Sequence, residues 1–275
     1  MENYHFFKTS DEVILYYEDV GEGKPIVFVP GYMCTTEFWR RNVPELSKSY
    51  RVITFDPRGY GRSFKSNHGN TIKRHAEDIK ELIDHLKLED VMLIGWSTGG
   101  SVVSAYCHYH NNYKLKGLGL LDAPLFPFSP ESWNGHGCHG YNIDKWIQSM
   151  MLDLISNPEK YYNDFVNRVF GLDCPEEERT WITAELKKTP VWIGAELHMD
   201  YCHTDAVKML ESVAVPTIIY AGNSPAYPLS MSQSYMDHLH VPTEFHPFME
   251  GGHVLFYKEY KKFNQVTLEF LKKLY

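Results

Sequence analysis

The 275-residue chain lacks the features that mark secreted, membrane-bound or nucleic-acid-binding proteins. Its five cysteines are scattered and odd in number, so we expect no disulfide framework and favour a reducing, cytoplasmic location. No basic and then apolar segment opens the sequence, and no apolar run is long enough to span a bilayer. A formal net charge of -8 argues against nucleic-acid and membrane partners.

The apolar residues, 43% of the chain, form short runs that alternate with amphipathic segments. Short apolar runs are typical of buried strands, and apolar residues at helical spacing are typical of helices packed on a sheet. The pattern predicts an α/β fold, with a mostly parallel central sheet flanked by helices. We expect strands at 12–20, 25–30, 50–56, 91–96, 115–121, 216–222 and 243–249, and helices at 71–87 (with Asn70 as N-cap), 98–110, 229–240 and 254–274.

The alternation stops within residues 124–211, which contain helix-like segments and no strand-like run. We therefore expect residues 1–123 and 212–275 to form the α/β core, and 124–211 to form an inserted helical cap over the catalytic edge of the sheet. The cap holds 14 acidic and 7 basic residues, which is most of the net charge of the chain. This acidity either provides a solvated outer surface or creates a field that disfavours anionic substrates.

The motif GWSTGG at 95–100 follows a short apolar run and opens a helix. A serine on such a tight strand-to-helix turn takes a strained backbone, and small residues two positions away on each side let strand and helix approach. The N-terminus of the helix adds N–H donors and a positive dipole beside the hydroxyl. The motif therefore predicts that Ser97 is a nucleophile; the simpler alternative is a serine that only caps the helix.

Three further motifs follow strand ends, namely PGY at 30–32, DPRGYGRS at 56–63 and GH at 252–253. Together with the motif at 95–100, they make the chain resemble the α/β-hydrolase superfamily, and serine esterases and lipases in particular, over nearly its whole length. The resemblance implies that a histidine after the last strand acts as the base for the serine.

The resemblance assigns this role to His253, and it implies that the backbone N–H groups of Tyr32 and Thr98 form an oxyanion hole. Relatives commonly carry His-Gly where this chain has Pro30-Gly31. Because the donors belong to the backbone, we expect the oxyanion hole to survive that difference.

The acid departs from the usual family pattern. Relatives usually place it after the strand corresponding to 216–222, but the turn at 222–228 has no carboxylate, and the next acidic residue is Asp237. Asp122 directly follows the preceding strand, and some members of the family resemble this arrangement. We therefore expect Asp122 to orient His253; the alternative is that Asp122 only caps the start of the insertion.

A serine nucleophile disfavours epoxide hydrolase and haloalkane dehalogenase chemistry, which need a carboxylate at that position. No NAD-type or P-loop fingerprint is present, so no cofactor is expected. Two clusters of possible ligands lack a recognised zinc spacing, so no metal is expected either. These clusters are His198, Cys202, His203 and Asp205, and His136, Cys138 and His139.

Large apolar residues suggest a pocket for a small, largely apolar ester. We expect Trp96 beside the nucleophile, and Leu125, Phe126 and Phe128 at the entrance. Apolar residues of the cap either line the same pocket or pack the cap itself. They are Trp133, Trp146, Trp181, Trp192 and the pair Met150-Met151.

The sequence thus predicts a serine hydrolase that cleaves a small-molecule carboxylic ester, with a lactone as a variant. Two alternatives stay open. The same residues suit a cofactor-free perhydrolase or haloperoxidase-like activity, and a hydrolase scaffold with slow or no turnover suits a ligand receptor.

Overall fold

A computed structural model describes residues 4–129, 143–224 and 227–275. Within these residues, eight strands form one sheet in the order β1-β2-β4-β3-β5-β6-β7-β8. Pairing is antiparallel at β1/β2 and β2/β4 and parallel elsewhere, which confirms the predicted mostly parallel α/β sheet. The strands are β1 (Tyr4–Lys8), β2 (Ile14–Val20), β3 (Pro25–Val29), β4 (Arg51–Asp56), β5 (Val91–Trp96), β6 (Leu115–Leu121), β7 (Thr217–Gly222) and β8 (Thr243–Phe248).

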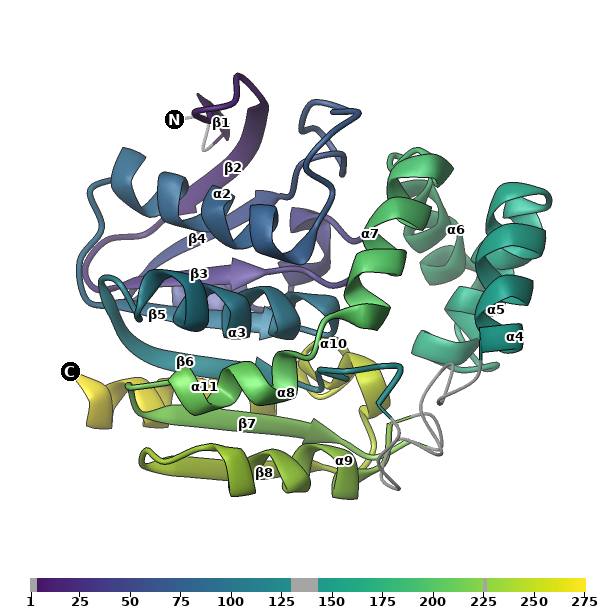
Figure 1. Cartoon of the computed structure of the whole chain (residues 1–275). Coiled ribbons are helices and arrows are strands. Elements are labelled where there is room, and N and C mark those ends of the chain that lie inside the picture. Colours follow the sequence, from purple (N-terminus) through teal and green to yellow (C-terminus); the bar gives the residue numbers. More distant parts are fainter. Residues whose placement is uncertain (1–3, 130–142, 225–226) are drawn as a thin grey trace.

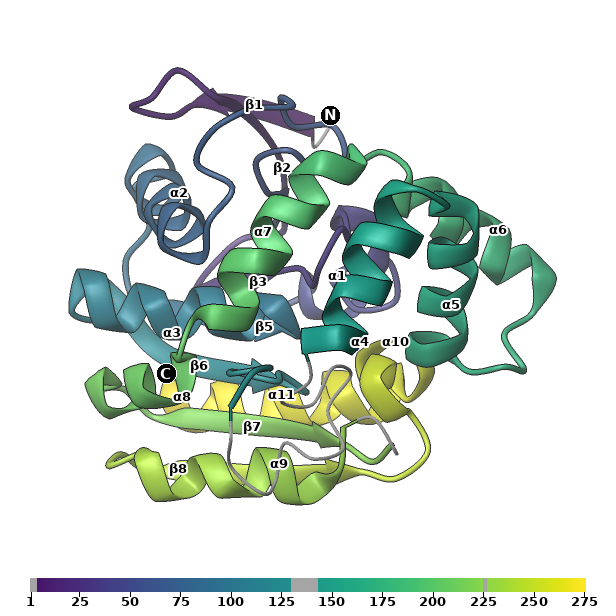
Figure 2. The same ribbon diagram turned by 45° about the vertical axis from the view of Figure 1, so that its right-hand side comes forward.

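Helices cover both faces of the sheet, because strands that are apolar throughout need cover on both sides. Figures 1 and 2 show α2 (Ile72–His85), α3 (Thr98–His110) and α8 (Ala206–Met209) on one face. On the other face lies α11 (Tyr260–Leu274), which contacts α1 (Val43–Leu46). Among the described residues, no helix has the length and apolar character needed to cross a membrane.

Between β6 and β7, the described residues 143–203 form helices that lie beyond the carboxyl ends of the parallel strands (Figure 1). They are α4 (Ile143–Ile147), the π-helical η3 (Gln148–Ile155), α5 (Pro158–Phe170), α6 (Glu176–Leu186) and α7 (Val191–His203). These helices, α4 to α7, fall within the predicted cap at 124–211, and from here on the cap means α4 to α7. Trp133, His136, Cys138 and His139 lie outside the described residues.

Some elements differ from the sequence prediction. Strand β1 was not predicted, because it is short and most of its side chains are exposed. The predicted N-cap Asn70 is wrong: the Thr71 hydroxyl accepts the Arg74 N–H (3.2 Å) at the start of α2. Strand boundaries otherwise agree to within two residues, since the apolar runs end where burial ends.

The predicted terminal helix at 254–274 is interrupted. The chain forms a 3₁₀ turn η6 (Gly252–Val254), then α10 (Leu255–Lys258), and α11 starts only after Glu259. Glu259 leaves helical geometry (ψ 37°), and its carboxylate accepts the Gly251 N–H at 2.6 Å. This contact holds the loop that leads into His253.

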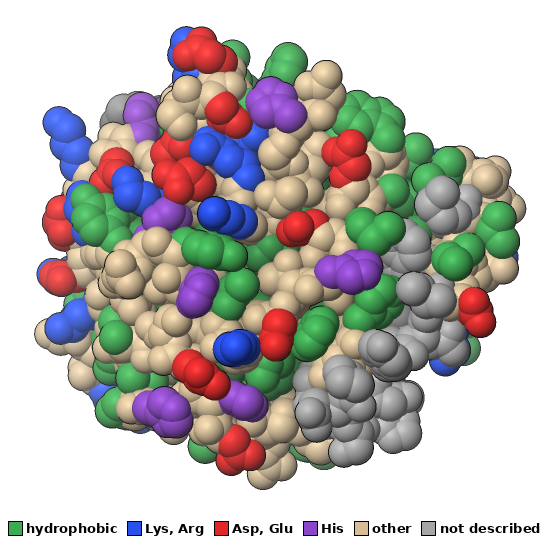
Figure 3. All heavy atoms as spheres, in the orientation of Figure 1, with side chains coloured by type: hydrophobic (Ala, Val, Ile, Leu, Met, Phe, Trp, Pro, Cys, Tyr) green, Lys and Arg blue, Asp and Glu red, His purple; other side chains and the backbone are tan. Residues whose placement is uncertain are grey.

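Three carboxylates of the cap bind donors of the core. Glu185 accepts from the Thr35 hydroxyl (2.7 Å), Glu196 accepts from the Asn70 amide (2.8 Å), and Asp200 accepts the Ile72 N–H (2.7 Å) at the N-terminus of α2. A carboxylate at a helix N-terminus also gains from the helix dipole. On the one face that Figure 3 shows, acidic side chains are scattered over the surface and do not form one large patch. Part of the acidity of the cap thus holds it to the core.

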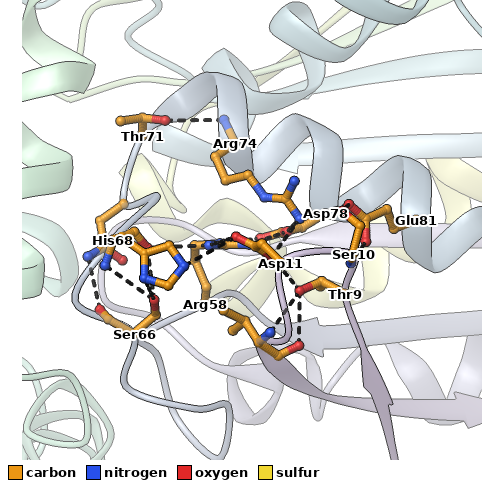
Figure 4. Close-up of polar contacts among 12 residues, drawn as sticks. Thr9, Ser10, Asp11, Arg58, Ser66, His68, Thr71, Arg74, Asp78 and Glu81 are labelled. Atoms are coloured by element: carbon orange, nitrogen blue, oxygen red, sulfur yellow. Dashed lines mark hydrogen bonds and ion pairs between the residues drawn. The ribbon is translucent and has the colours of Figure 1, made fainter.

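A buried ion network fixes the loop after β4 against α2 (Figure 4). The fully buried guanidinium of Arg58 donates to Asp78 (2.7 Å) and to Asp11 (2.9 Å), and Arg74 joins both carboxylates. His75 lies in the same region, and burial, with Arg58 and Arg74 nearby, lowers its pKa to about 3. Both effects disfavour an imidazolium there.

This environment predicts acid sensitivity. The pKa of His75 is near 6.5 in the unfolded chain and about 3 in the folded protein. Between these values only the unfolded chain binds the proton, so the free energy of unfolding is highest above about pH 6.5 and falls as the pH drops toward 3. We expect the free energy of unfolding to fall by about 2 kcal/mol less in His75→Leu than in the wild type between pH 8 and pH 5. Urea denaturation at both pH values measures this. His240→Leu, at an exposed site, is the control; an equal pH dependence in wild type and His75→Leu would refute the assignment.

Candidate active site

Ser97 lies on a strained turn between β5 and α3. Its φ of 54° and ψ of -123° lie outside the regions that L-residues favour. Glycines allow the turn: a Cβ on Gly95 would lie 2.3 Å from the Gly99 carbonyl oxygen, and one on Gly99 would lie 2.6 Å from the Val29 carbonyl oxygen. A Cβ on Gly100 would lie 2.2 Å from the Cβ of Ala123. The three glycines of the GWSTGG motif are therefore required because neighbouring segments leave no room for a Cβ at these positions.

The structure brings Ser97, His253 and Asp122 together. His253 Nε2 is 2.9 Å from Ser97 Oγ, and His253 Nδ1 is 2.7 Å from Asp122 Oδ2. All three side chains are buried. An imidazole held in this way can take the hydroxyl proton, while the carboxylate fixes its tautomer and balances the charge that forms.

Asp122 is held from two sides at the end of β6. Its N–H donates to the Tyr220 carbonyl oxygen (2.8 Å), and its Oδ1 accepts the Gly222 N–H (2.8 Å). Gly222 ends β7, the strand after which relatives usually carry the acid. A Cβ on Gly222 would lie 2.1 Å from the Gly252 carbonyl oxygen and 3.1 Å from Asp122 Cγ. The end of β7 thus contributes a backbone N–H that donates to Asp122, and it does not contribute a carboxylate of its own.

The two expected oxyanion donors lie beside Ser97. Thr98 is the first residue of α3, where amide N–H groups have no acceptor within the helix. Tyr32 follows Gly31, at which a Cβ would lie 3.2 Å from Ser97 Cβ. Tyr32 and Thr98 both line the same pocket as Ser97, so both expected donor residues adjoin the nucleophile.

A pocket with a volume of about 30 Å³ adjoins Ser97 and His253. Core residues that line it include Tyr32, Cys34 and Trp96, and the cap contributes from α5 and α7. Burial raises the pKa of the Cys34 thiol well above its ordinary value, so this sulfur stays protonated and is a poor nucleophile. The remaining described lining residues are Thr98, Phe165, Arg168, Val169, His198, Tyr201 and Tyr227.

Trp96 lines the pocket, as expected, and its indole N–H donates to the His253 carbonyl oxygen at 2.9 Å. The other three residues that were expected at the entrance do not line the pocket. Leu125 is fully buried and would contact a Cβ on Gly100, and Phe128 packs edge-on against His203 of α7. Phe126 packs, partly buried, against the hydrophobic core.

The large apolar residues of the cap are also divided. Trp181 packs on Phe38 and Tyr257 and under Arg40, which attaches α6 to the core. Trp192 is 43% exposed, and neither tryptophan lines the pocket. The apolar residues that α5 contributes to the lining are Phe165 and Val169, which sequence spacing alone did not distinguish from the other buried residues of that helix.

The described cluster of possible metal ligands is used in other contacts. His198 Nδ1 is 3.2 Å from Cys202 Sγ, and Asp205 accepts the Lys208 N–H at the start of α8. Across residues 4–129, 143–224 and 227–275, no three His, Cys, Asp or Glu side chains are grouped so as to hold a metal ion.

The sequence model of the alpha/beta hydrolase fold matches residues 24–260. This chain belongs to the alpha/beta hydrolase family. The chain is 28% identical to AB hydrolase superfamily protein YisY of Bacillus subtilis, and the match covers 97% of this chain and 98% of that protein. It is also 28% identical to a non-heme haloperoxidase of Rhodococcus erythropolis, over 79% and 81% of the two chains. An esterase structure from Exiguobacterium antarcticum shares the fold, with a TM-score of 0.88, 24% identity and coverage of 97% and 98%.

In this hydrolase, Tyr227 covers one face of the His253 imidazole. The two rings are stacked, with centroids 4.1 Å apart and an interplanar angle of 22°. The Tyr227 N–H donates to the Ser224 carbonyl oxygen, and the Tyr227 carbonyl oxygen accepts the Ser224 N–H, both at 3.2 Å. The sequence analysis did not predict a role for Tyr227, because residues 222–228 were searched only for a carboxylate.

The stack predicts that Tyr227 shields His253 from solvent and reagents. We expect Tyr227→Leu to raise the rate of carbethoxylation of His253 by diethyl pyrocarbonate severalfold, because the smaller side chain opens space through which the reagent can reach the imidazole nitrogen Nε2. Tyr227→Phe keeps the stacked ring and is the matched control. Peptide mapping by mass spectrometry measures the modification at each histidine. An unchanged rate at His253 in the leucine variant would contradict the shielding.

Proposed function

We propose that this alpha/beta hydrolase is a serine hydrolase that cleaves a carboxylic ester, or a lactone, of a small and largely apolar molecule. Ser97 attacks the carbonyl carbon while His253 takes its proton, and Asp122 orients and stabilises the imidazolium. The N–H groups of Tyr32 and Thr98 hold the oxyanion. His253 then protonates the leaving alcohol, and water releases the acyl group from Ser97.

The hydrogen-bonded chain from Asp122 through His253 to Ser97 carries this proposal, because its distances of 2.7 and 2.9 Å fit proton transfer. The small pocket supports a short acyl group. Its volume is only about 30 Å³, so it has no room for a long acyl chain.

A second candidate is a perhydrolase or haloperoxidase-like activity, in which hydrogen peroxide replaces water and the acyl-enzyme releases a peracid. The similarity to the haloperoxidase of Rhodococcus erythropolis favours keeping this candidate. Peroxide-dependent bromination in the presence of acetate, compared with hydrolysis of p-nitrophenyl acetate, separates the two activities.

The proposal predicts covalent labelling at Ser97. We expect a fluorophosphonate probe to label the wild type in a one-to-one ratio, and Ser97→Ala to lose both labelling and ester hydrolysis. Ser101→Ala is the matched control, because it removes a buried hydroxyl from the next turn of α3. Intact-protein mass spectrometry measures the labelling. A wild type that binds ligands but is neither labelled nor active on any p-nitrophenyl ester would indicate a receptor instead.

The acid assignment makes a separate prediction. Asp122→Asn should lower kcat on the order of 10⁴-fold, because an amide cannot fix the imidazole tautomer or balance its charge. Asp237→Asn, at an exposed residue of η5 (Tyr235–His238), should stay near wild-type activity. Steady-state kinetics on p-nitrophenyl acetate give both values. The reverse pattern would show that Asp237, and not Asp122, is the acid that orients His253.

A further inference from the structure

Tyr32, one of the two expected oxyanion donors, lies in a tight turn after β3. The Cys34 N–H donates to the Gly31 carbonyl oxygen at 3.0 Å and so closes a four-residue turn. The third residue of the turn, Met33, has a φ of 57°, which a bulky side chain adopts only with strain. A strained backbone persists only where surrounding contacts hold it. The position of the Tyr32 N–H therefore depends on what packs against this turn.

The core holds the start of the turn beside the nucleophile. A Cβ on Gly31 would lie 3.0 Å from the indole ring of Trp96 and 3.2 Å from Ser97 Cβ. This close approach brings the backbone of Gly31 next to the reacting serine. The two residues in the middle of the turn, Tyr32 and Met33, have buried side chains, and these pack against the cap.

Both side chains meet the cap at Gly194 of α7. A Cβ on Gly194 would lie 2.8 Å from the Tyr32 hydroxyl oxygen and 3.1 Å from Met33 Sδ, so the contact leaves no room for a methyl group. One turn further along α7, His198 packs edge-on against the Tyr32 ring, with centroids 5.0 Å apart. From η3, Met150 Sδ lies 3.9 Å from the Tyr32 hydroxyl. The side chain of an expected oxyanion residue is thus held by two elements of the cap.

Helix α7 is itself fixed to the core. Figure 1 shows it between the sheet and the other helices of the cap. Its Ile193 packs on the loop after β4, where a Cβ on Gly59 would lie 2.5 Å from Ile193 Cγ2. Glu196 and Asp200 of the same helix accept hydrogen bonds from the core. Gly194 therefore sits on a support that cannot move away from the turn without breaking these contacts.

We propose that Gly194 is a positioning residue for the oxyanion hole. Because it has no side chain, α7 approaches the turn closely enough to hold Tyr32 and Met33, and this contact keeps the Tyr32 N–H directed at the oxyanion. The inference rests on the proposed esterase function and adds that the cap sets the geometry of the oxyanion hole. Gly194 is not among the described residues that line the pocket, so it acts through Tyr32 and not on the substrate.

The kinetic test is Gly194→Ala. Alanine favours a helix more than glycine does, so helix propensity alone predicts no loss of function. We expect kcat on p-nitrophenyl acetate to fall on the order of 10- to 100-fold, which is less than complete removal of an oxyanion donor costs. The fall in KM or its rise should be much smaller, because the donor acts mainly in the transition state. The rate of fluorophosphonate labelling at Ser97 should fall with kcat, and an unchanged kcat would overturn the inference.

A rescue experiment shows whether the effect passes through Tyr32. Phenylalanine lacks the hydroxyl that the new methyl group would meet at 2.8 Å, so Gly194→Ala should lower kcat severalfold less in Tyr32→Phe than in the wild type. Met199→Ala is the control, because it raises the helix propensity of α7 at an exposed site and should leave kcat near that of the wild type. Circular dichroism and thermal melting check that each variant is folded. An equal fall in both backgrounds would overturn the role of Gly194 as a support for Tyr32.

Hydrogen exchange tests the support without turnover. The Cys34 N–H closes the turn, so its exchange with deuterium reports opening of the turn. In Ser97→Ala, we expect Gly194→Ala to speed exchange in the peptide that contains Cys34 severalfold, and Tyr32→Phe to reduce that gain. This result supports the inference even if the wild type cleaves no ester. Unchanged exchange would overturn it, whereas ester hydrolysis by the wild type would still support the esterase.

Discussion

The hydrogen-bonded chain from Asp122 through His253 to Ser97 is the constraint on which the rest of the site depends. Its three members follow three different strands, β6, β8 and β5, and they meet only because these strands end at the same edge of one parallel sheet. The strain at Ser97 is part of the same constraint. A relaxed turn would place the hydroxyl elsewhere, and the turn is held because glycines let α3 approach β3 and β5 more closely than any side chain allows.

The contacts of Asp122 show how the ends of two neighbouring strands can hold one carboxylate. Strands β6 and β7 are neighbours with parallel register, so their ends lie close to the same imidazole. When the carboxylate comes from β6, the end of β7 is left with its backbone amide, and the Gly222 N–H donates to Asp122. The buried carboxylate of Asp122 thus accepts one hydrogen bond from Gly222 and one from His253, and a buried charge requires such partners. Tyr227, which also follows β7 in the sequence, stacks on His253.

The sequence predicted those parts of the molecule that local patterns control. Buried strands are short apolar runs, and a strained serine needs glycines at fixed offsets. The strands and the serine turn could therefore be predicted from the sequence, whereas the order of the strands in the sheet could not. Contacts between distant segments were not visible. Leu125, Phe126 and Phe128 follow the acid in sequence, but the direction of each side chain depends on helices that lie about 80 residues further on. The actual pocket wall from α5 could not be separated from ordinary buried residues, because burial gives both the same spacing.

The acidic composition of the cap shows why a sum of charges is a poor guide to a field inside a pocket. Glu185, Glu196 and Asp200 face the core and are satisfied by its donors. Electrostatic interactions fall with distance and are screened by salt at the surface, whereas a half-buried charge beside the reacting atoms is screened less. Carboxylates at the junction of cap and core therefore contribute mainly to attachment.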